Sequence, residues 1–347
     1  MEKLNVYINK KAEAKVLNNH PWVFTSDITK TDENIKNGDI VTVRNNKDKF
    51  LGSAFYNNNS KIVLRIISRN ANDTFDYDFF KRRIEYALSY RMKVMPNDLN
   101  AFRLIYGEAD FLSGLTVDKF NDVLVCQILS LGIDIRKDII LKALYDVVSK
   151  YFKIRGIYLR CDVALREKEG LEEYVGWYDK IPVTSQETTT EIVENGLKYL
   201  VDFKEGQKTG FFLDQKYNRL TIRNLAKDMT VLDCCTHTGS FAMNAALGGA
   251  KKVMALDISQ KALLDAKKNF WLNNLTIDTY CADLFDYLRK LVDSKNKEYN
   301  LIILDPPAFT KSKDTIKSAL KGYQEINYLA MKTLPRGGYL ATASCSH

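Results

Sequence analysis

The fold is decided by the stretch Val231-Leu232-Asp233-Cys234-Cys235-Thr236-His237-Thr238-Gly239. An apolar run that ends in an acidic residue, followed by a short polar loop closing on glycine, is typical of a buried strand that leads into a helix. The glycine permits a close approach of the backbone to a ligand, and the following helix offers free amide donors. Because the loop lacks the G-x-G-x-x-G pattern of dinucleotide binders, we do not expect a pyrophosphate ligand here.

The alternation of strand and helix continues beyond this stretch. Further apolar runs occupy residues 253–256, 301–304 and 338–343, and segments rich in helix-forming residues separate them. Alternating units of this kind predict an α/β fold with a parallel, Rossmann-like sheet. Ligands of such sheets bind at the carboxyl ends of the strands, so the residues that follow each run are the candidates for function.

Four carboxylates follow successive strands of this predicted sheet. They are separated by 24, 26 and 22 residues, one strand-helix unit each time, and they are Asp233, Asp257, Asp283 and Asp305. Carboxylates in these positions can line one cofactor cleft. We expect Asp257 to accept hydrogen bonds from two ribose hydroxyls and Asp283 to accept one from an adenine amino group. Any one of them alone could instead be a turn residue that caps a helix.

A stiff loop follows the run at 301–304. Its sequence is Asp305-Pro306-Pro307-Ala308-Phe309, in which two prolines restrict the backbone and expose carbonyl groups. Such a loop can hold a planar base, with Asp305 at the amino edge of the base and Phe309 available to stack on its face. The alternative is a simple turn at the end of a strand.

One cysteine follows the next predicted strand. Cys345 lies in Ala343-Ser344-Cys345-Ser346-His347, and the expected strand order brings it beside Asp305. C5 of cytosine is a poor nucleophile until a thiolate adds to C6, so a cysteine at this position could perform that addition. Without this context, a cysteine with apolar neighbours is more often an inert part of a core.

The first 70 residues have a different character. Short apolar runs are separated by turn signals such as Asn37-Gly38-Asp39, which predicts a small β-barrel. This segment holds twelve basic and seven acidic side chains, so its excess of five positive charges is most of the chain's net charge of +8. A basic surface of this kind suits RNA. Aromatic residues here, such as Trp22 and Phe24, could stack on bases or belong to the barrel core.

Residues 71–190 indicate a separate α+β domain. An amphipathic helix runs up to Pro96, and strand-like runs at 102–106, 115–120, 123–129 and 156–161 surround a helical stretch at 134–151. Asn195-Gly196, between two alternating runs, is a strong hairpin signal. We therefore expect three domains: residues 1–70, residues 71–190, and residues 191–347 with the hairpin at their start.

Composition excludes several classes of protein. The chain has 347 residues, of which 46% are hydrophobic, so it can bury full cores in two or three domains. Its six cysteines form no C-x-x-C pair and it has three histidines, so we expect no metal site and a reduced, cytoplasmic setting. No apolar run is long enough to cross a bilayer, so we expect no membrane association.

These residues resemble the large-subunit ribosomal RNA methyltransferase family of cytosine-C5 enzymes, which join an N-terminal PUA domain to a class I methyltransferase domain. The resemblance spans the whole chain. It is carried by His20-Pro21-Trp22-Val23-Phe24, Gly52-Ser53-Ala54, Phe102-Arg103-Leu104-Ile105-Tyr106-Gly107-Glu108-Ala109-Asp110, Glu205-Gly206-Gln207-Lys208-Thr209-Gly210-Phe211-Phe212-Leu213-Asp214-Gln215, the Asp233 loop, Asp305-Pro306-Pro307-Ala308-Phe309-Thr310-Lys311-Ser312 and Ser344-Cys345-Ser346-His347.

The resemblance implies S-adenosylmethionine as the cofactor and 23S ribosomal RNA as the substrate. It implies that Cys345 is the nucleophile, that Asp305 orients the base, and that Pro306, Pro307 and Phe309 bind it. The cofactor residues that it implies are Phe212, Gln215, Asp233, Thr236, Gly239, Asp257, Ile258, Asp283, Leu284 and Asp305.

The chain departs from the family pattern at two points. Cys234-Cys235 stands where an aromatic residue is common, a change that leaves Asp233 and Gly239 in place. A class I domain also normally continues through another helix and a β-hairpin, so we expect the sheet to lack its last strands.

Two other functions stay open on the residues alone. A methyltransferase acting on an amino group, N6 of adenine or N2 of guanine, would use the Asp305 loop and leave Cys345 idle. A non-catalytic RNA-binding or ribosome-assembly factor would bind RNA without the cofactor. The expected partner in each case is RNA, and a homodimer is a further assembly to consider.

Overall fold

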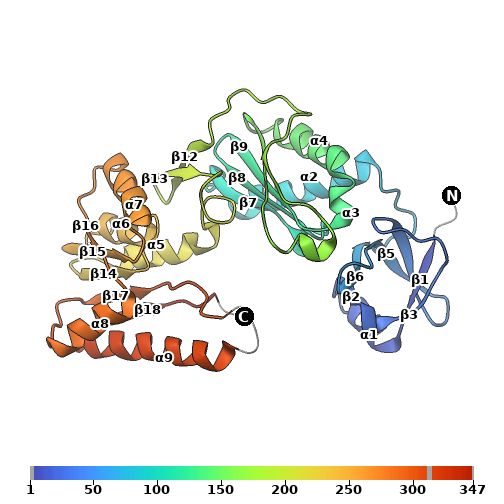
Figure 1. Cartoon of the computed structure of the whole chain (residues 1–347). Coiled ribbons are helices and arrows are strands. Elements are labelled where there is room, and N and C mark those ends of the chain that lie inside the picture. Colours follow the sequence, from blue (N-terminus) through green and yellow to red (C-terminus); the bar gives the residue numbers. More distant parts are fainter. Residues whose placement is uncertain (1–3, 311–314, 346–347) are drawn as a thin grey trace. The chain divides into compact units, whose positions relative to one another are not determined.

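The computed structural model describes residues 4–310 and 315–345, which form two compact units (Figure 1). The first unit comprises Met1–Ile192 and Val201–Leu213, and the second comprises Val193–Leu200 and Asp214–His347. No helix among the described residues has both the length and the apolar character needed to cross a membrane.

The first unit begins with a six-stranded sheet in the order β2-β6-β5-β4-β1-β3. Its core contains Val6, Val43 and Leu64, none of which is exposed to solvent. The predicted turn at Gly38 has a φ of +93°, a conformation that glycine adopts readily, and it leads into β4. The elements are β1 Asn5–Ile8, α1 Lys10–Leu17, β2 Trp22–Phe24, β3 Ile28–Thr31, β4 Ile40–Asn45, β5 Phe50–Tyr56 and β6 Ile62–Ser68.

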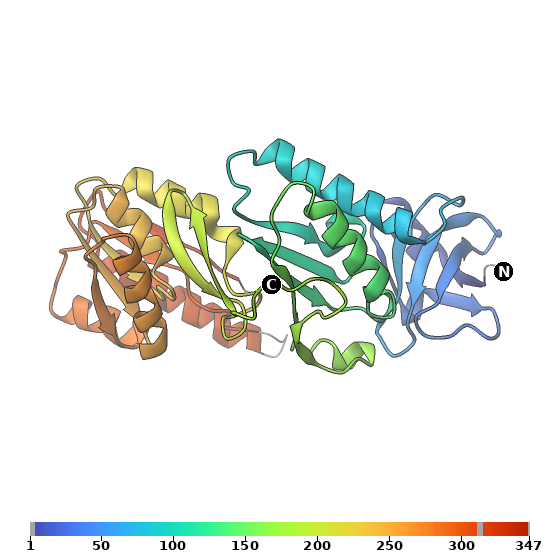
Figure 2. The same ribbon diagram turned by 90° about the horizontal axis from the view of Figure 1, so that it is seen from above.

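The second sheet of this unit has five strands in the order β11-β10-β9-β8-β7. Helices α2 and α4 run alongside each other on this sheet (Figure 2) and share its core with residues such as Ile84, Leu144 and Val117. The elements are α2 Tyr77–Val94, β7 Ala101–Tyr106, β8 Leu115–Phe120, β9 Val123–Ile128, α3 Leu131–Asp134, α4 Lys137–Val148, β10 Gly156–Cys161 and β11 Tyr174–Trp177.

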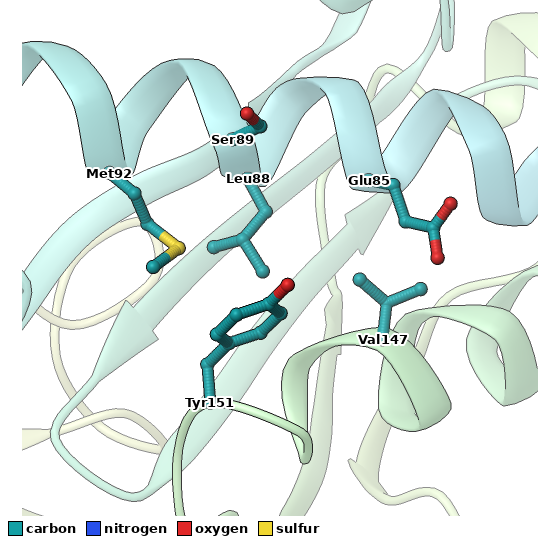
Figure 3. Close-up of a pocket in the computed structure, with 6 residues that line it drawn as sticks. All are labelled: Glu85, Leu88, Ser89, Met92, Val147 and Tyr151. Carbon is teal, nitrogen blue, oxygen red and sulfur yellow. The ribbon is translucent and has the colours of Figure 1, made fainter.

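The helix expected at 134–151 corresponds to α4, which begins three residues later, and residue 134 instead ends the short helix α3. Arg136 leaves the helical conformation, with φ −104° and ψ 12°, so the chain breaks between them. A hollow lies between α2 and α4 (Figure 3), and it is lined by Glu85, Leu88, Ser89, Met92, Val147 and Tyr151. All six residues belong to the first unit, whereas the four predicted carboxylates belong to the second.

The predicted hairpin is confirmed. Strands β12 Thr189–Glu194 and β13 Leu197–Asp202 form a two-stranded sheet, and its turn has φ values of +53° at Asn195 and +74° at Gly196. Two consecutive positive φ values are typical of the type I′ turn that Asn-Gly favours. The tip of the hairpin belongs to the second unit, where buried Glu194 accepts two hydrogen bonds from Arg219 on α5, at 2.6 and 2.9 Å.

The second unit contains the predicted parallel sheet, which is confirmed. Its five strands follow the order β16-β15-β14-β17-β18, and each neighbouring pair is parallel. Helices α5, α6 and α7 lie on one side of the sheet and α8 and α9 on the other (Figure 1). The elements are α5 Lys216–Leu225, β14 Thr230–Cys234, α6 Ser240–Leu247, β15 Lys252–Asp257, α7 Gln260–Leu272, β16 Asp278–Cys281, α8 Leu284–Asp293, β17 Leu301–Leu304, α9 Ile316–Thr333 and β18 Tyr339–Thr342.

Candidate functional site

The register of the parallel sheet brings the carboxyl ends of its strands to one edge. Cys234 at the end of β14 pairs with Leu256 of β15 and with Leu304 of β17. Asp257 and Asp305 are the next residues after those partners, so they lie at one level, that of Cys235, and both are close enough to act on the Asp233 carboxyl. Three of the four carboxylates that the sequence singles out are therefore neighbours in space.

Asp233 is the most buried of these carboxylates, with 1% of its surface exposed. One oxygen, Oδ2, accepts hydrogen bonds from Thr236 Oγ1 at 2.5 Å and from Ala242 N at 3.0 Å. The other oxygen, Oδ1, is buried and has no hydrogen-bond partner among the described residues. The pKa of the Asp233 carboxyl is raised to about 7, chiefly by burial. The hydrogen bonds from Thr236 and Ala242 lower this pKa, and the nearby Asp305 and Asp257 add to the rise.

Backbone amides fix the position of Asp257. Its Oδ2 accepts from His237 N and its Oδ1 accepts from Ser259 N, both at 2.9 Å. The loop that supplies His237 N contains three residues with positive φ, namely Cys235, His237 and Gly239. Such a conformation is unfavourable for side chains other than glycine, so the surrounding structure must hold this loop in shape. Ile258, next to Asp257, is 69% exposed and adjoins the same edge.

Gly239 serves packing as well as the turn. A Cβ atom on this residue would lie 2.3 Å from the Phe270 ring and 3.1 Å from Ala266 Cβ, both on α7. Its φ of +80° also favours glycine. The space where a side chain would stand is thus filled by α7, and the close approach of the Gly239 backbone to a cofactor stays a prediction.

Asp283 caps helix α8. Its Oδ1 accepts hydrogen bonds from Phe285 N at 2.8 Å and from Asp286 N at 3.2 Å. The capping role that the sequence left open is therefore present at one carboxylate oxygen. The side chain of Leu284 packs in the core between the sheet and helices α8 and α9, with 7% of its surface exposed, so a ligand could reach only its backbone.

Cys235 is a site residue that the spacing of carboxylates did not reveal. Burial raises the pKa of its thiol to about 12, with further contributions from Asp257, Asp233, Asp305 and Asp283 in that order. The thiol therefore stays protonated and lies within the electrostatic reach of all four carboxylates. The only signal in the sequence was the departure from the family pattern at Cys234-Cys235.

The Asp305 loop contacts a second predicted residue. Gln215 Nε2 donates to Asp305 Oδ1 at 3.3 Å, and Asn218 Nδ2 donates to Gln215 Oε1 at 2.6 Å. These contacts orient both the amide and the carboxylate. Thr236 and Gln215 thus each donate to one carboxylate of this edge, Asp233 and Asp305 respectively.

Cys345 lies beside the same loop. Strand β18 pairs in parallel with β17, and Ala343 N donates to Leu304 O at 2.8 Å. The Cys345 thiol is exposed and donates to the carbonyl of the buried Pro306 at a sulfur-to-oxygen distance of 3.7 Å. The expected neighbourhood of Cys345 and the Asp305 loop is confirmed, while Ser346 and His347 lie outside the described residues.

Phe309 packs against the helices of its own unit. Its ring centroid lies 4.4 Å from that of Tyr323 on α9 and 6.0 Å from that of Phe285 on α8. The ring is only partly exposed, whereas Pro307 is the exposed member of the loop. The stacking role expected of Phe309 stays a prediction.

Phe212 belongs to the first unit, while Gln215 of the same motif belongs to the second. Lys208 Nζ lies 4.6 Å from the centroid of the Phe212 ring. Upstream of these residues, Thr209 Oγ1 donates to the buried Asp118 at 2.6 Å, which anchors the motif within the first unit. The expected contact of Phe212 with a cofactor also stays a prediction.

Two family models match the chain. A PUA-like domain matches residues 6–69, and an S-adenosylmethionine-dependent methyltransferase matches residues 170–344. The first match covers the six-stranded sheet, and the second covers the hairpin and the parallel sheet. The second match includes the edge of the sheet that bears Asp233, Asp257 and Asp305, which we call the carboxylate edge.

Curated relatives match over nearly the whole chain. Proteins named ribosomal RNA large subunit methyltransferase I are 39% identical in Aeromonas salmonicida and 40% identical in Vibrio cholerae, in each case over 98% of this chain and 85% of the relative. The protein of that name from Klebsiella pneumoniae is 37% identical over 97% of this chain and 83% of the relative.

Two solved structures share the fold. A methyltransferase, SMU.776, complexed with SAH superposes with a TM-score of 0.82, and an S-adenosylmethionine-dependent methyltransferase from Streptococcus mutans superposes with a TM-score of 0.80. Each is 23% identical and is matched over 98% of this chain and 85% of its own length.

Proposed function

The chain belongs to the ribosomal RNA large subunit methyltransferase I family of S-adenosylmethionine-dependent methyltransferases, and from this premise we propose that it methylates C5 of a cytosine in 23S ribosomal RNA, in the cytoplasm, through a covalent adduct of Cys345. The PUA-like domain and the excess of positive charge in the first 70 residues support RNA as the substrate.

The residues at the carboxylate edge suit the cofactor. The unpartnered Oδ1 of Asp233 and the neighbouring Asp257 and Asp305 form an acidic site that attracts a ligand with positive charge. In the proposed arrangement Asp257 holds the ribose, Asp283 uses its second oxygen for the adenine, and Asp233 and Asp305 face the charged end. When bound, S-adenosylmethionine supplies a methyl group on a positively charged sulfur.

The proposed chemistry assigns separate roles to Cys345 and Asp305, which lie on neighbouring loops. The Cys345 thiolate adds to C6 of the cytosine, which turns C5 into an enamine carbon that can attack the methyl group. Asp305 orients the base through its amino group. A base then removes the proton from C5, the bond between C6 and sulfur breaks, and Cys345 leaves as the thiolate.

One observation carries this proposal beyond the family assignment. Cys345 Sγ lies 3.7 Å from the carbonyl oxygen of Pro306, the residue next to Asp305. A nucleophile and a base-orienting carboxylate must act on the same ring, so their residues must lie on adjacent loops. A methyltransferase that acts on an amino group would not need an exposed thiol there.

Product analysis tests the proposal. We expect that deproteinised large-subunit rRNA incubated with the protein and radiolabelled S-adenosylmethionine carries the label in 5-methylcytidine after digestion. Cys345→Ala should lower the rate by about a thousandfold or more, because the thiolate addition activates C5. RNA containing 5-fluorocytidine should form a denaturant-resistant complex with the wild-type protein, because fluorine at C5 prevents the final elimination.

Cys281→Ala is the matched control. Cys281 is also an exposed cysteine at the carboxyl edge of the sheet, and its thiol donates to Ile258 O at 3.4 Å. We expect this variant to keep nearly full activity. Full-rate transfer by Cys345→Ala, or label in an N6-methyladenosine or N2-methylguanosine, would reject the C5 mechanism in favour of amino-group methylation.

A further inference from the structure

The first unit exposes an unusual group of aromatic side chains. Tyr86 and Tyr90 on α2 are 62% and 59% exposed, Tyr106 at the end of β7 is 60% exposed, and Phe111 is 48% exposed. Tyr86 and Tyr90 are four residues apart, so they project from the same face of the helix. Large aromatic side chains gathered on the surface of a protein usually mark a binding site.

Arginines connect these four aromatic side chains into one surface. The Arg83 guanidinium lies 5.0 Å from the Phe111 ring centroid, and Arg83 and Tyr86 are three residues apart on helix α2, so they are neighbours on its surface. Arg103 lies 5.4 Å from the Tyr106 ring centroid. We call the set Arg83, Tyr86, Tyr90, Arg103, Tyr106 and Phe111 the aromatic-arginine surface.

Hydrogen bonds link helix α2, which carries Tyr86 and Tyr90, to the segment that carries Tyr106 and Phe111. Arg91 lies 5.4 Å from the Tyr90 ring centroid, and its Nη2 donates to Asp110 Oδ2 at 2.7 Å. The same oxygen accepts from Tyr106 N at 2.6 Å, and Arg91 Nε donates to Arg103 O at 3.2 Å. The rings therefore stand on a rigid support, so little ordering is needed when a ligand binds.

The charge around the surface suits a polyanion. Helix α2 carries five basic side chains, Lys81, Arg82, Arg83, Arg91 and Lys93, against the two acidic side chains Asp78 and Glu85. Two of the five form ion pairs, Arg82 with Asp73 and the buried Arg91 with Asp110, so the cations that can face a phosphate are chiefly Lys81, Arg83 and Lys93. Glu85 lines the hollow beside α4 (Figure 3), so the helix turns this acid toward α4. Exposed rings combined with positive charge are the features that bind single-stranded nucleic acid, because the rings stack on bases while the cations face phosphates.

We propose that the aromatic-arginine surface binds unpaired nucleotides of the RNA substrate by stacking bases on Tyr86, Tyr90, Tyr106 and Phe111. This inference rests on the proposed RNA substrate and adds a contact that neither the PUA-like domain nor the carboxylate edge provides. It specifies single strands, because bases inside a duplex cannot stack on side chains.

Binding of a fluorescein-labelled oligouridine, followed by fluorescence anisotropy, tests the inference on the full chain. Each of Tyr86→Ala and Tyr90→Ala should weaken the affinity about tenfold, in line with the loss of one stacked base. Tyr86→Phe and Tyr90→Phe keep the ring and should bind within about twofold of the wild type. A duplex RNA of equal length should bind all five proteins alike.

Tyr151→Ala is the matched control, since Tyr151 is 59% exposed in the same unit but lies in the hollow beside α4 (Figure 3). We expect it to bind oligouridine like the wild type. Equal binding by the wild type and both alanine variants would overturn the inference and leave the surface to a protein partner. Weaker binding by Tyr151→Ala to the same degree would also overturn it.

This result is independent of the product analysis. Oligouridine binding requires no methyl transfer, so a product other than 5-methylcytidine would reject the proposed C5 chemistry and leave this inference intact. Unchanged affinity of the tyrosine variants, with 5-methylcytidine as the product, would reject the inference alone. The midpoint of thermal unfolding should stay the same in all variants, because the substituted side chains are exposed.

Discussion

Buried carboxylates occur in two regions of the molecule, and the two regions treat them differently. In the first unit, Glu169 is 2% exposed and accepts from Arg65 Nη2 at 2.7 Å and from Asn57 Nδ2 at 3.0 Å. At the carboxylate edge of the second unit, Asp233 is 1% exposed and has only acidic neighbours among the described charged groups that affect its pKa. A carboxylate with a fixed cation stabilises the fold, whereas a buried one without a cation is a candidate for a ligand site.

The region around Glu169 and Arg65, which we call the paired region, joins the two sheets of the first unit. Arg65 lies on β6 of the six-stranded sheet, while Glu169 lies in the connection between β10 and β11 of the five-stranded sheet. Trp22 Nε1 donates to Glu108 Oε1 at 2.9 Å, and Ser113 Oγ donates to the same oxygen at 2.7 Å. Two of the motifs that carry the family resemblance therefore meet here in a structural contact, which argues against base stacking by Trp22.

The largest expected effect is on stability in the paired region. Glu169→Gln leaves the buried Arg65 without its nearest counter-ion, and we expect the free energy of unfolding to fall by about 3–5 kcal/mol. Urea denaturation followed by circular dichroism measures this change. Glu167→Gln alters an exposed glutamate two residues away and should change stability by less than about 0.5 kcal/mol. Equal stabilities of the two variants would remove the distinction between the regions.

The next largest effect is on how the free energy of unfolding depends on pH, through Asp233 at the carboxylate edge. The pKa of Asp233 is about 7 in the folded protein and 3.8 in its ordinary state, so the folded protein binds this proton more tightly. The resulting stability is fully present below about pH 4 and is lost as the pH rises through about 7. Asp233→Asn should remove roughly 3 kcal/mol of this decline between pH 4 and 7.

Urea denaturation of the wild type and of Asp233→Asn at several pH values measures the difference. The charged or titratable groups that act on Asp233 or lie in the same loop are Asp257, Asp305 and Cys235, and burial lowers the pKa of the nearby His237. All of these groups remain in the variant, so their contributions to the pH dependence of stability cancel when the two proteins are compared. If the free energies of unfolding of the two proteins change in parallel with pH, folding does not raise the pKa of Asp233, and the prediction is wrong.

The smallest effect is on cofactor affinity. Asp233→Asn keeps the shape of the side chain but removes its negative charge, so binding of S-adenosylmethionine should weaken by about ten- to a hundredfold. Isothermal titration calorimetry measures this affinity. Asp293→Asn, which changes an exposed carboxylate at the end of α8, should bind the cofactor like the wild type, as should Glu169→Gln at low temperature where it is folded.

Local sequence patterns predicted much of the fold. The Asn195-Gly196 turn, the long helix α2 and the parallel strands of the second unit all occur where composition and spacing indicated them. These features depend on backbone preferences and on the period of apolar residues within a few positions of each other. The break at Arg136 was missed because the apolar spacing continues through it.

The sequence predicted which residues lie at the candidate site better than it predicted what each of them contacts there. Regular spacing placed the carboxylates after successive strands, and parallel pairing then brought Asp233, Asp257 and Asp305 to one edge. The cap that Asp283 forms on its own helix was left open as an alternative. Spacing gave no sign that Phe309 packs on Tyr323 or that α7 fills the space beside Gly239. Each of these depends on side chains that meet only after the helices pack.

The sequence by itself determined the class of fold, the order of its strands and helices, and the family. Only the tertiary structure decided which buried charges are neutralised. Glu169 pairs with Arg65, which is 104 residues away in the sequence, while Asp233 has no cation among the described groups that affect its pKa. The reason is physical: the energy of a buried charge depends on the groups within a few ångströms of it, and packing brings those groups from distant parts of the chain.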